Sequence, residues 1–290
     1  MLRALAFLFL LVPAPAAAQP AFTSDRISVE VRGSGPDVVL IPGLSSSPRV
    51  WESTVAGVPG YRYHLVHVAG FAGKAPGGNA AGPVVAPVAE EIARYIAEAR
   101  LERPALVGHS LGGSLAMMVA ARHPDRAGRL MVVDMLPFMG AMFGGPNATP
   151  ESLRPVAEQM RNGIATATGE ARRQRIEQTI ASMVRTEALR PGAVEDTLNS
   201  DPAASGQAMA DLIVADLRPE LSAIRAPITV LWVIPAGAPF TLEQMTGFYR
   251  ASYANAPNAT LKNIPDAYHF IMWDAPEAFQ AELRSFLSAN

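Results

Sequence analysis

Short apolar runs alternate with segments of helical pattern along most of this chain. The runs at residues 37–43, 104–109 and 128–135 are continuous and apolar, which is typical of strands buried on both faces. Helical patterns stand between them, at residues 86–99 and 110–122. This alternation predicts an α/β fold with a mostly parallel central sheet and helices on both faces. In such sheets, sites lie at the carboxyl ends of the strands.

The alternation is interrupted between residues 137 and 225, where helical patterns follow one another without a clear strand. It resumes at residue 226, and the total of 290 residues suits one α/β domain that carries an insertion. We therefore expect a helical cap at residues 137–225, inserted into an α/β core formed by residues 19–136 and 226–290.

The first 18 residues have the order of a secretory signal peptide. Arg3 precedes an apolar run too short to span a bilayer, and Ala16-Ala17-Ala18 provides a small-residue cleavage site. We expect residues 1–18 to be removed and the protein to be periplasmic or secreted. An uncleaved N-terminal anchor is the alternative. After residue 18 no run of eighteen apolar residues follows, so no membrane association is expected after cleavage.

Composition excludes several classes of function. The formal net charge of -2 provides no basic surface for nucleic acid or anionic membranes. The chain has no cysteine, which excludes a thiol nucleophile and thiolate metal ligands. We expect a small-molecule substrate and neither a metal nor an organic cofactor. The oligomeric state is not indicated.

The sequence Gly108-His109-Ser110-Leu111-Gly112 stands where an apolar run changes into a helical pattern. It fits the pattern G-x-S-x-G, in which glycines permit a tight, strained turn and the strain exposes the serine hydroxyl. The first N–H groups of the following helix point toward the place where an oxyanion would form. A serine that only caps the helix is the plainer alternative.

In this setting "GHSLGG" resembles the nucleophile elbow of the α/β-hydrolase fold family. "LIPGLSSSPRVW" resembles the oxyanion loop of that family, and "YHFIMWDAPEAF" resembles its terminal block with the catalytic histidine. The resemblance covers nearly the whole chain after the signal segment. It implies Ser110 as nucleophile, His269 as base, and the backbone N–H groups of Leu44 and Leu111 as the oxyanion hole.

The acid of the triad is harder to assign. In much of the family it follows the strand that here reads "PITVLWVI", but Ala236 and Gly237 stand there. Some members carry the acid one strand earlier, where this chain has Asp134. A carboxylate that ends so apolar a strand needs a partner, and an imidazolium would be one. We expect Asp134 to be the acid, with Asp266, three residues before the base, as the alternative.

Large apolar side chains near these positions are candidates for the substrate pocket. We expect Trp51, Phe138 and Met139 to line it, although packing between cap and core would explain them equally well.

Together these features predict an exported serine hydrolase that cleaves a carboxylic ester or lactone through an acyl-enzyme. Hydrolysis of an amide, a thioester or a carbon–carbon bond by the same triad stays open, because a fold does not select a substrate. A non-catalytic ligand-binding protein on the same scaffold is the rival reading, and the missing carboxylate at Ala236 favours it.

Overall fold

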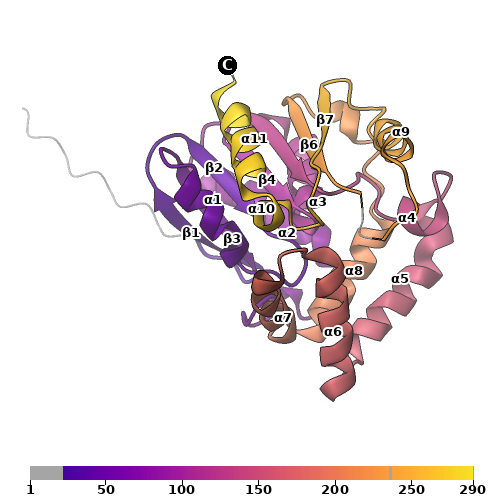
Figure 1. Ribbon diagram of the computed structural model, residues 1–290. Coiled ribbons are helices and arrows are strands. Elements are labelled where there is room, and N and C mark those ends of the chain that lie inside the picture. The colour runs from indigo at the N-terminus through magenta and orange to yellow at the C-terminus, as the bar shows by residue number, and fades with distance from the viewer. Residues whose placement is uncertain (1–21, 235–236, 290) are drawn as a thin grey trace, which may run out of the picture.

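The computed structural model describes residues 22–234 and 237–289, and the expected signal segment lies outside them (Figure 1). The strands are β1 (Ile27–Gly33), β2 (Asp37–Ile41), β3 (Arg62–Val68), β4 (Ala105–His109), β5 (Arg129–Val133), β6 (Ile228–Trp232) and β7 (Ala259–Asn263). The helices are α1 (Glu52–Gly57), α2 (Val85–Glu98), α3 (Leu111–Arg122), α4 (Ala141–Gly144), α5 (Pro150–Ala165), α6 (Gly169–Met183), α7 (Arg190–Leu198), α8 (Pro202–Val214), α9 (Leu242–Ser252), α10 (Ile271–Asp274) and α11 (Pro276–Ser288).

The strands form one seven-stranded sheet in the order β1-β3-β2-β4-β5-β6-β7. Only β1 runs antiparallel to its neighbour, and the other pairs among these strands are parallel. The prediction of a mostly parallel sheet within an α/β fold is therefore confirmed.

Successive residues of the central strands pack on opposite faces of the sheet. In β2, Val39 and Ile41 belong to the hydrophobic cluster under α2 and α3, whereas Val38 and Leu40 belong to the cluster under α1 and α11. All four side chains are 0% exposed. Burial on both faces explains why these strands appear in the sequence as continuous apolar runs.

Helices α4 to α8 lie between β5 and β6 in the chain, within the stretch expected to form a cap. Figure 1 shows α5 to α8 gathered at one end of the sheet. Helix α5 packs along α8, and Leu153, Ala157 and Ile213 form a small apolar cluster of their own between them.

Within residues 22–234 and 237–289, no helix combines the length and apolar character needed to cross a bilayer.

Candidate active site

Ser110 stands at a sharp turn between β4 and α3. Its φ of 53° and ψ of -123° place it in a region that residues with a side chain rarely occupy. A Cβ at Gly108 would lie 2.1 Å from the carbonyl oxygen of Gly112, and one at Gly112 would lie 2.2 Å from that of Ile41. Only glycine fits at these two positions, so strand and helix approach closely and the strained turn persists.

A histidine and a carboxylate meet beside this turn. His269 lies between β7 and α10, and its Nδ1 is 2.6 Å from Oδ2 of Asp134, which directly follows β5. The other carboxylate oxygen of Asp134 accepts hydrogen bonds from the Val233 N–H and the Tyr249 hydroxyl, each at 3.2 Å. The Asp134 carboxylate is thus held at both oxygens, and its bond fixes the orientation of the imidazole.

Asp266, the other carboxylate that the sequence left open, lies elsewhere. Its side chain is 85% exposed and pairs with Arg185 at 3.5 Å. Ala236 lies outside the described residues. Of the two aspartates considered, Asp134 is the one bonded to His269.

His109 connects the turn to the segment that carries His269. The ring of His109 is 1% exposed, and its Nε2–H donates to the backbone oxygen of His269 at 3.0 Å. Its Nδ1 has no hydrogen-bond partner among the described residues. Burial, with a smaller contribution from nearby His269, holds the pKa of His109 well below its ordinary value, so the ring is neutral. The sequence singled out its neighbour Ser110 but gave no signal for this contact.

The loop after β2 packs against the same turn. A Cβ at Gly43 would lie 3.1 Å from Cβ of Ser110, so the backbone of this loop is beside the serine. Neither the Leu44 N–H nor the Leu111 N–H donates to an acceptor within the described part of the chain. Both groups are therefore available to an oxygen atom of a bound molecule. Ser110 Oγ likewise makes no hydrogen bond to another described residue.

Two of the expected pocket residues are buried in the protein interior. Trp51 is 0% exposed and packs against Phe279, with ring centroids 6.2 Å apart. Phe138 is 1% exposed and lies under the guanidinium of Arg218, 4.5 Å from its ring centroid. Their predicted place at a pocket wall is corrected to interior packing, because each fills space between elements. Met139 is partly buried. It packs against both the main hydrophobic core and the small apolar cluster between α5 and α8.

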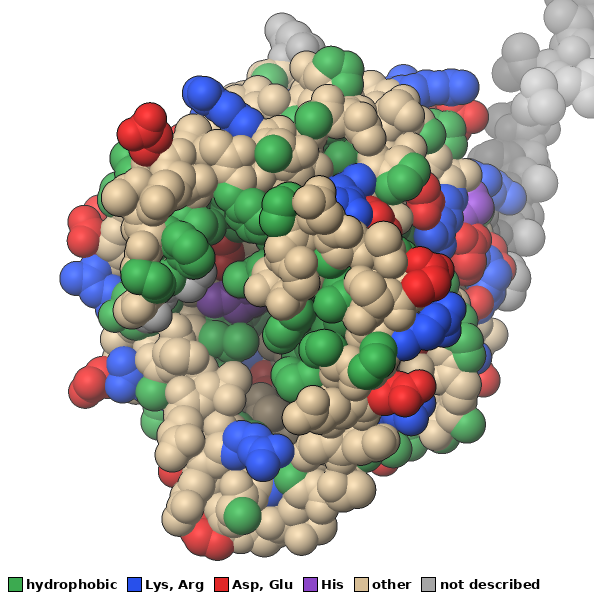
Figure 2. Space-filling model, turned by 90° about the vertical axis from the view of Figure 1, so that its right-hand side faces the viewer, with side chains coloured by type: hydrophobic (Ala, Val, Ile, Leu, Met, Phe, Trp, Pro, Cys, Tyr) green, Lys and Arg blue, Asp and Glu red, His purple; other side chains and the backbone are tan. Residues whose placement is uncertain are grey.

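The face that Figure 2 presents has a hollow with a histidine at its floor and hydrophobic side chains around it. The His269 side chain is 21% exposed and that of Asp134 is 12% exposed. The described part of the chain also exposes the large apolar side chains of Met142 and Phe143 on α4, and of Phe240 and Leu242 before and at the start of α9.

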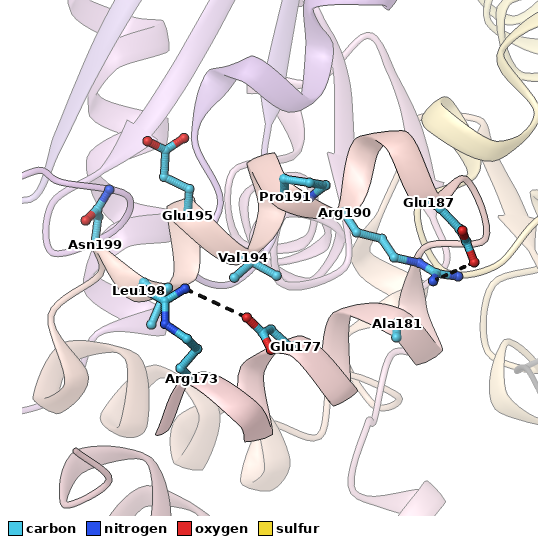
Figure 3. Close-up of a pocket in the computed structure, with 10 residues that line it drawn as sticks. All are labelled: Arg173, Glu177, Ala181, Glu187, Arg190, Pro191, Val194, Glu195, Leu198 and Asn199. Carbon is cyan, nitrogen blue, oxygen red and sulfur yellow. Dashed lines mark hydrogen bonds and ion pairs between the residues drawn. The ribbon is translucent and has the colours of Figure 1, made fainter. Parts of the chain in front are cut away.

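A separate cavity of about 690 Å³ lies between α6 and α7 (Figure 3). Its charged side chains are paired with one another or with neighbours, as in Arg190 with Glu187 at 3.2 Å and Arg173 with Glu177 at 3.8 Å. None of its lining residues is Ser110, His269 or Asp134, so it is not the site described above. The described residues also contain no group of three or more metal-ligating side chains that would hold an ion.

Comparison with known proteins agrees with this architecture. The model of the "Alpha/beta hydrolase family" matches residues 38–282. A pimeloyl-(acyl-carrier protein) methyl ester esterase of Pectobacterium carotovorum is 24% identical over 262 residues, which are 90% of this chain and 98% of that protein. The enzyme of the same name from Aeromonas hydrophila is 35% identical over 128 residues, or 44% of this chain and 48% of that protein.

Solved structures share the fold at lower identity. A hydrolase from Pseudomonas aeruginosa has a TM-score of 0.74 at 18% identity, covering 91% of this chain and 94% of that one. The enol-lactonase from Burkholderia xenovorans has a TM-score of 0.71 at 19% identity, covering 91% of this chain and 96% of that one.

Proposed function

Because the chain belongs to the alpha/beta hydrolase family and is thus a hydrolase, we propose that it is an exported serine esterase or lactonase. Ser110, His269 and Asp134 form its catalytic triad in this proposal, and the N–H groups of Leu44 and Leu111 form its oxyanion hole. The single observation that carries it is the 2.6 Å bond between His269 and Asp134 beside the strained Ser110 turn.

Each group has a role that its chemistry supports. A serine hydroxyl is a weak nucleophile and needs a base within reach, and the base needs an acid that holds its tautomer. With Nδ1–H donated to Asp134, the lone pair of His269 lies on Nε2, where it takes the Ser110 proton. The hydrogen bond between Ser110 Oγ and His269 Nε2 is expected to form when substrate binds, since catalytic hydrogen bonds are often long or absent before that.

In the acylation step, Ser110 Oγ attacks the carbonyl carbon while its proton moves to His269 Nε2. The carbonyl oxygen becomes an oxyanion that accepts hydrogen bonds from the N–H groups of Leu44 and Leu111. The carbon–oxygen bond to the leaving alkoxide then breaks, and that alkoxide takes the proton from His269. The products of this step are an alcohol and an acyl-enzyme on Ser110.

Deacylation repeats these events with water as the nucleophile. The water oxygen attacks the acyl carbon while His269 takes a proton from the water. The bond between the acyl carbon and Ser110 Oγ then breaks, His269 gives this proton to Ser110 Oγ, and the acid leaves. For a lactone, the alcohol and the acid are two ends of one product. Two of the similar proteins, a methyl ester esterase and an enol-lactonase, are named for action on an ester and a lactone, which supports such a carbonyl as the target.

A fluorophosphonate probe tests the triad directly. We expect the native protein to be labelled on Ser110, and labelling to disappear in Ser110→Ala and after heat unfolding. Protein that hydrolyses no p-nitrophenyl ester and takes no label at Ser110 would be a binding protein on a hydrolase scaffold, contrary to the proposal.

Export is a separate part of the proposal, supported by the signal-like order of residues 1–18. Expression of the full chain in a Gram-negative host, followed by cell fractionation and mass spectrometry, tests it. We expect a periplasmic protein whose first residue is Gln19, and a cytoplasmic, uncleaved chain would contradict export.

A further inference from the structure

We propose that the cap positions the oxyanion loop, through the side chains of Asp196 and Ser205. The oxyanion loop is defined here as residues 43–47. The inference rests on the proposed function, because it concerns the Leu44 N–H that would bind the oxyanion. It assigns to the cap a part in catalysis.

The oxyanion loop contains a turn that its own sequence does not favour. The Ser46 N–H donates to the Gly43 carbonyl at 3.2 Å, which closes a four-residue turn with Leu44 and Ser45 in the middle. Ser45 has a φ of 54°, in the left-handed region. A turn with positive φ at its third residue normally has glycine there. Serine must therefore be held in this conformation by its surroundings.

The surroundings that hold Ser45 belong to the cap. Its hydroxyl is 2.9 Å from the hydroxyl of Ser205, on α8. The Ser200 hydroxyl lies 3.4 Å from the Ser45 carbonyl, but it donates its one proton to the nearer Asp196 carbonyl at 2.8 Å. The Ser45, Ser200 and Ser205 residues are 4–5% exposed, so water does not compete for these bonds. The Ser200 hydroxyl also accepts from the Ala72 N–H at 2.8 Å, which links the loop after β3 to the segment between α7 and α8.

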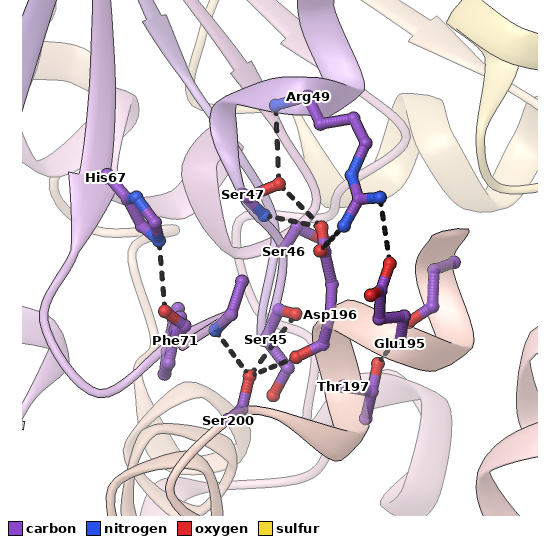
Figure 4. A network of polar contacts seen from close by, with 12 residues as sticks. Ser45, Ser46, Ser47, Arg49, His67, Phe71, Glu195, Asp196, Thr197 and Ser200 are labelled. Atoms are coloured by element: carbon purple, nitrogen blue, oxygen red, sulfur yellow. Dashed lines mark hydrogen bonds and ion pairs between the residues drawn. The ribbon is translucent and has the colours of Figure 1, made fainter. Parts of the chain in front are cut away.

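Asp196, on α7, holds the other end of the oxyanion loop. One oxygen of its carboxylate accepts from the Ser47 hydroxyl at 2.6 Å and from the Ser47 N–H at 3.1 Å. The other oxygen pairs with the Arg49 guanidinium (Figure 4). Asp196 is 7% exposed, and a carboxylate is seldom buried this far unless it is paired. The cap thus bonds to the oxyanion loop at Ser45, inside the turn, and at Ser47, directly after it.

Glu195 provides a matched control for Asp196. It is the preceding residue on α7, and its carboxylate pairs with the same Arg49 at 3.0 Å. Its side chain is 61% exposed, and its carboxylate makes no bond to residues 43–47. Removing Glu195 therefore perturbs the charge around Arg49 without releasing the oxyanion loop.

Hydrogen–deuterium exchange tests the positioning without any reaction. In Asp196→Ala and Ser205→Ala we expect the amides of Ser46 and Ser47, which donate to the Gly43 carbonyl and the Asp196 carboxylate, to exchange at least about tenfold faster than in the wild type. In Glu195→Ala they should exchange as in the wild type. If Asp196→Ala does not fold, Ser205→Ala and Ser47→Ala test the same bonds with smaller changes.

Kinetics on p-nitrophenyl butyrate tests the link to catalysis. Since one oxyanion donor is worth about 10²–10³ in kcat, a misplaced donor should lower kcat at least about tenfold in Asp196→Ala, with KM little changed. Glu195→Ala should keep both constants. Adding Ser45→Gly to Asp196→Ala should restore part of the lost kcat, because glycine adopts the left-handed conformation without support.

Unchanged exchange and unchanged kcat in Asp196→Ala and Ser205→Ala, even with a lower Tm, would overturn the inference. Failure of Ser45→Gly to restore any rate would overturn the argument from the strained turn. A wild-type protein that takes no fluorophosphonate label would instead overturn the proposed function, and the exchange measurement would still decide whether the cap holds residues 43–47.

Discussion

Asp134 directly follows β5, the strand next to β4, which leads to Ser110. Its φ of 50° is in the left-handed region, which aspartate tolerates better than most residues. Two donors hold one of its oxygens and His269 holds the other. A carboxylate satisfied in this way keeps one orientation, which is what the acid of a triad requires.

Replacing each candidate acid separately tests this assignment. Asp134→Asn should lower kcat by roughly 10³ to 10⁴, because an amide that donates to Nδ1 selects the wrong imidazole tautomer. Asp266→Asn should leave kcat unchanged, since its side chain faces solvent and Arg185. Ester hydrolysis at saturating substrate measures both. The opposite pattern would transfer the role of acid to Asp266.

Tyr249 provides a finer test of how Asp134 is held. Burial and the nearby Asp134 charge raise the pKa of Tyr249 well above its ordinary value, so its hydroxyl stays protonated and donates. Tyr249→Phe removes a hydrogen bond to the charged Asp134 carboxylate and should therefore lower kcat about tenfold. Tyr253→Phe is the matched control, because that hydroxyl donates to the Met135 carbonyl instead. Equal losses in both variants would indicate a general packing effect.

Two residues of the candidate site could be predicted from their place in the sequence. Ser110 is marked by its glycines, and His269 by its place after the last strand. The side-chain partners of Asp134 could not be predicted, because Val233 and Tyr249 approach it from other elements. The neutral His109 that binds the His269 carbonyl was also missed, since nothing in its local sequence distinguishes a buried donor.

At the scale of elements, the close contact of β4, α3 and the loop after β2 depends on glycine. Gly112→Ala would place a methyl group 2.2 Å from the Ile41 carbonyl and should destabilise the fold by about 2 kcal/mol or more. Gly247→Ala, inside α9, meets nothing within 4 Å and should stabilise by about 0.5–1 kcal/mol. Urea unfolding measures both, and similar values for the two variants would contradict the packing argument.

Strands β2, β4 and β5 and helices α2 and α3 agreed with the sequence pattern, because burial on both faces makes these strands continuous apolar runs that stand apart from the helical patterns between them. Helix α7 was not expected. It begins with Arg190-Pro191-Gly192, and proline and glycine usually interrupt helices, although proline is acceptable in the first turn. The pocket prediction also failed for Trp51 and Phe138, since apolar residues that pack inside and those that line a cleft have the same composition.

At the scale of the whole molecule, stability should depend on pH through buried histidines. Burial lowers the pKa of His64 and of His109 below their ordinary values, and His64 remains so despite its bond to Asp37. As pH falls below about 6.5, the unfolded chain takes up protons at these positions before the folded chain does. The free energy of unfolding should therefore decrease with falling pH over this window.

Urea unfolding at pH 7.5, 6.5 and 5.5 measures the effect, whose slope is at most about 1.4 kcal/mol per pH unit for each histidine. Stability that is constant or rises toward pH 5.5 would contradict the expectation.

The order of these parts along the chain has a consequence for biosynthesis. His269 follows β7, the last of the described strands, so the proposed base is synthesised after them. A chain that is still emerging from the ribosome has the proposed nucleophile and acid but not the proposed base. If the protein is exported as we propose, hydrolysis should begin only after almost the whole chain has been synthesised, which would protect esters inside the producing cell.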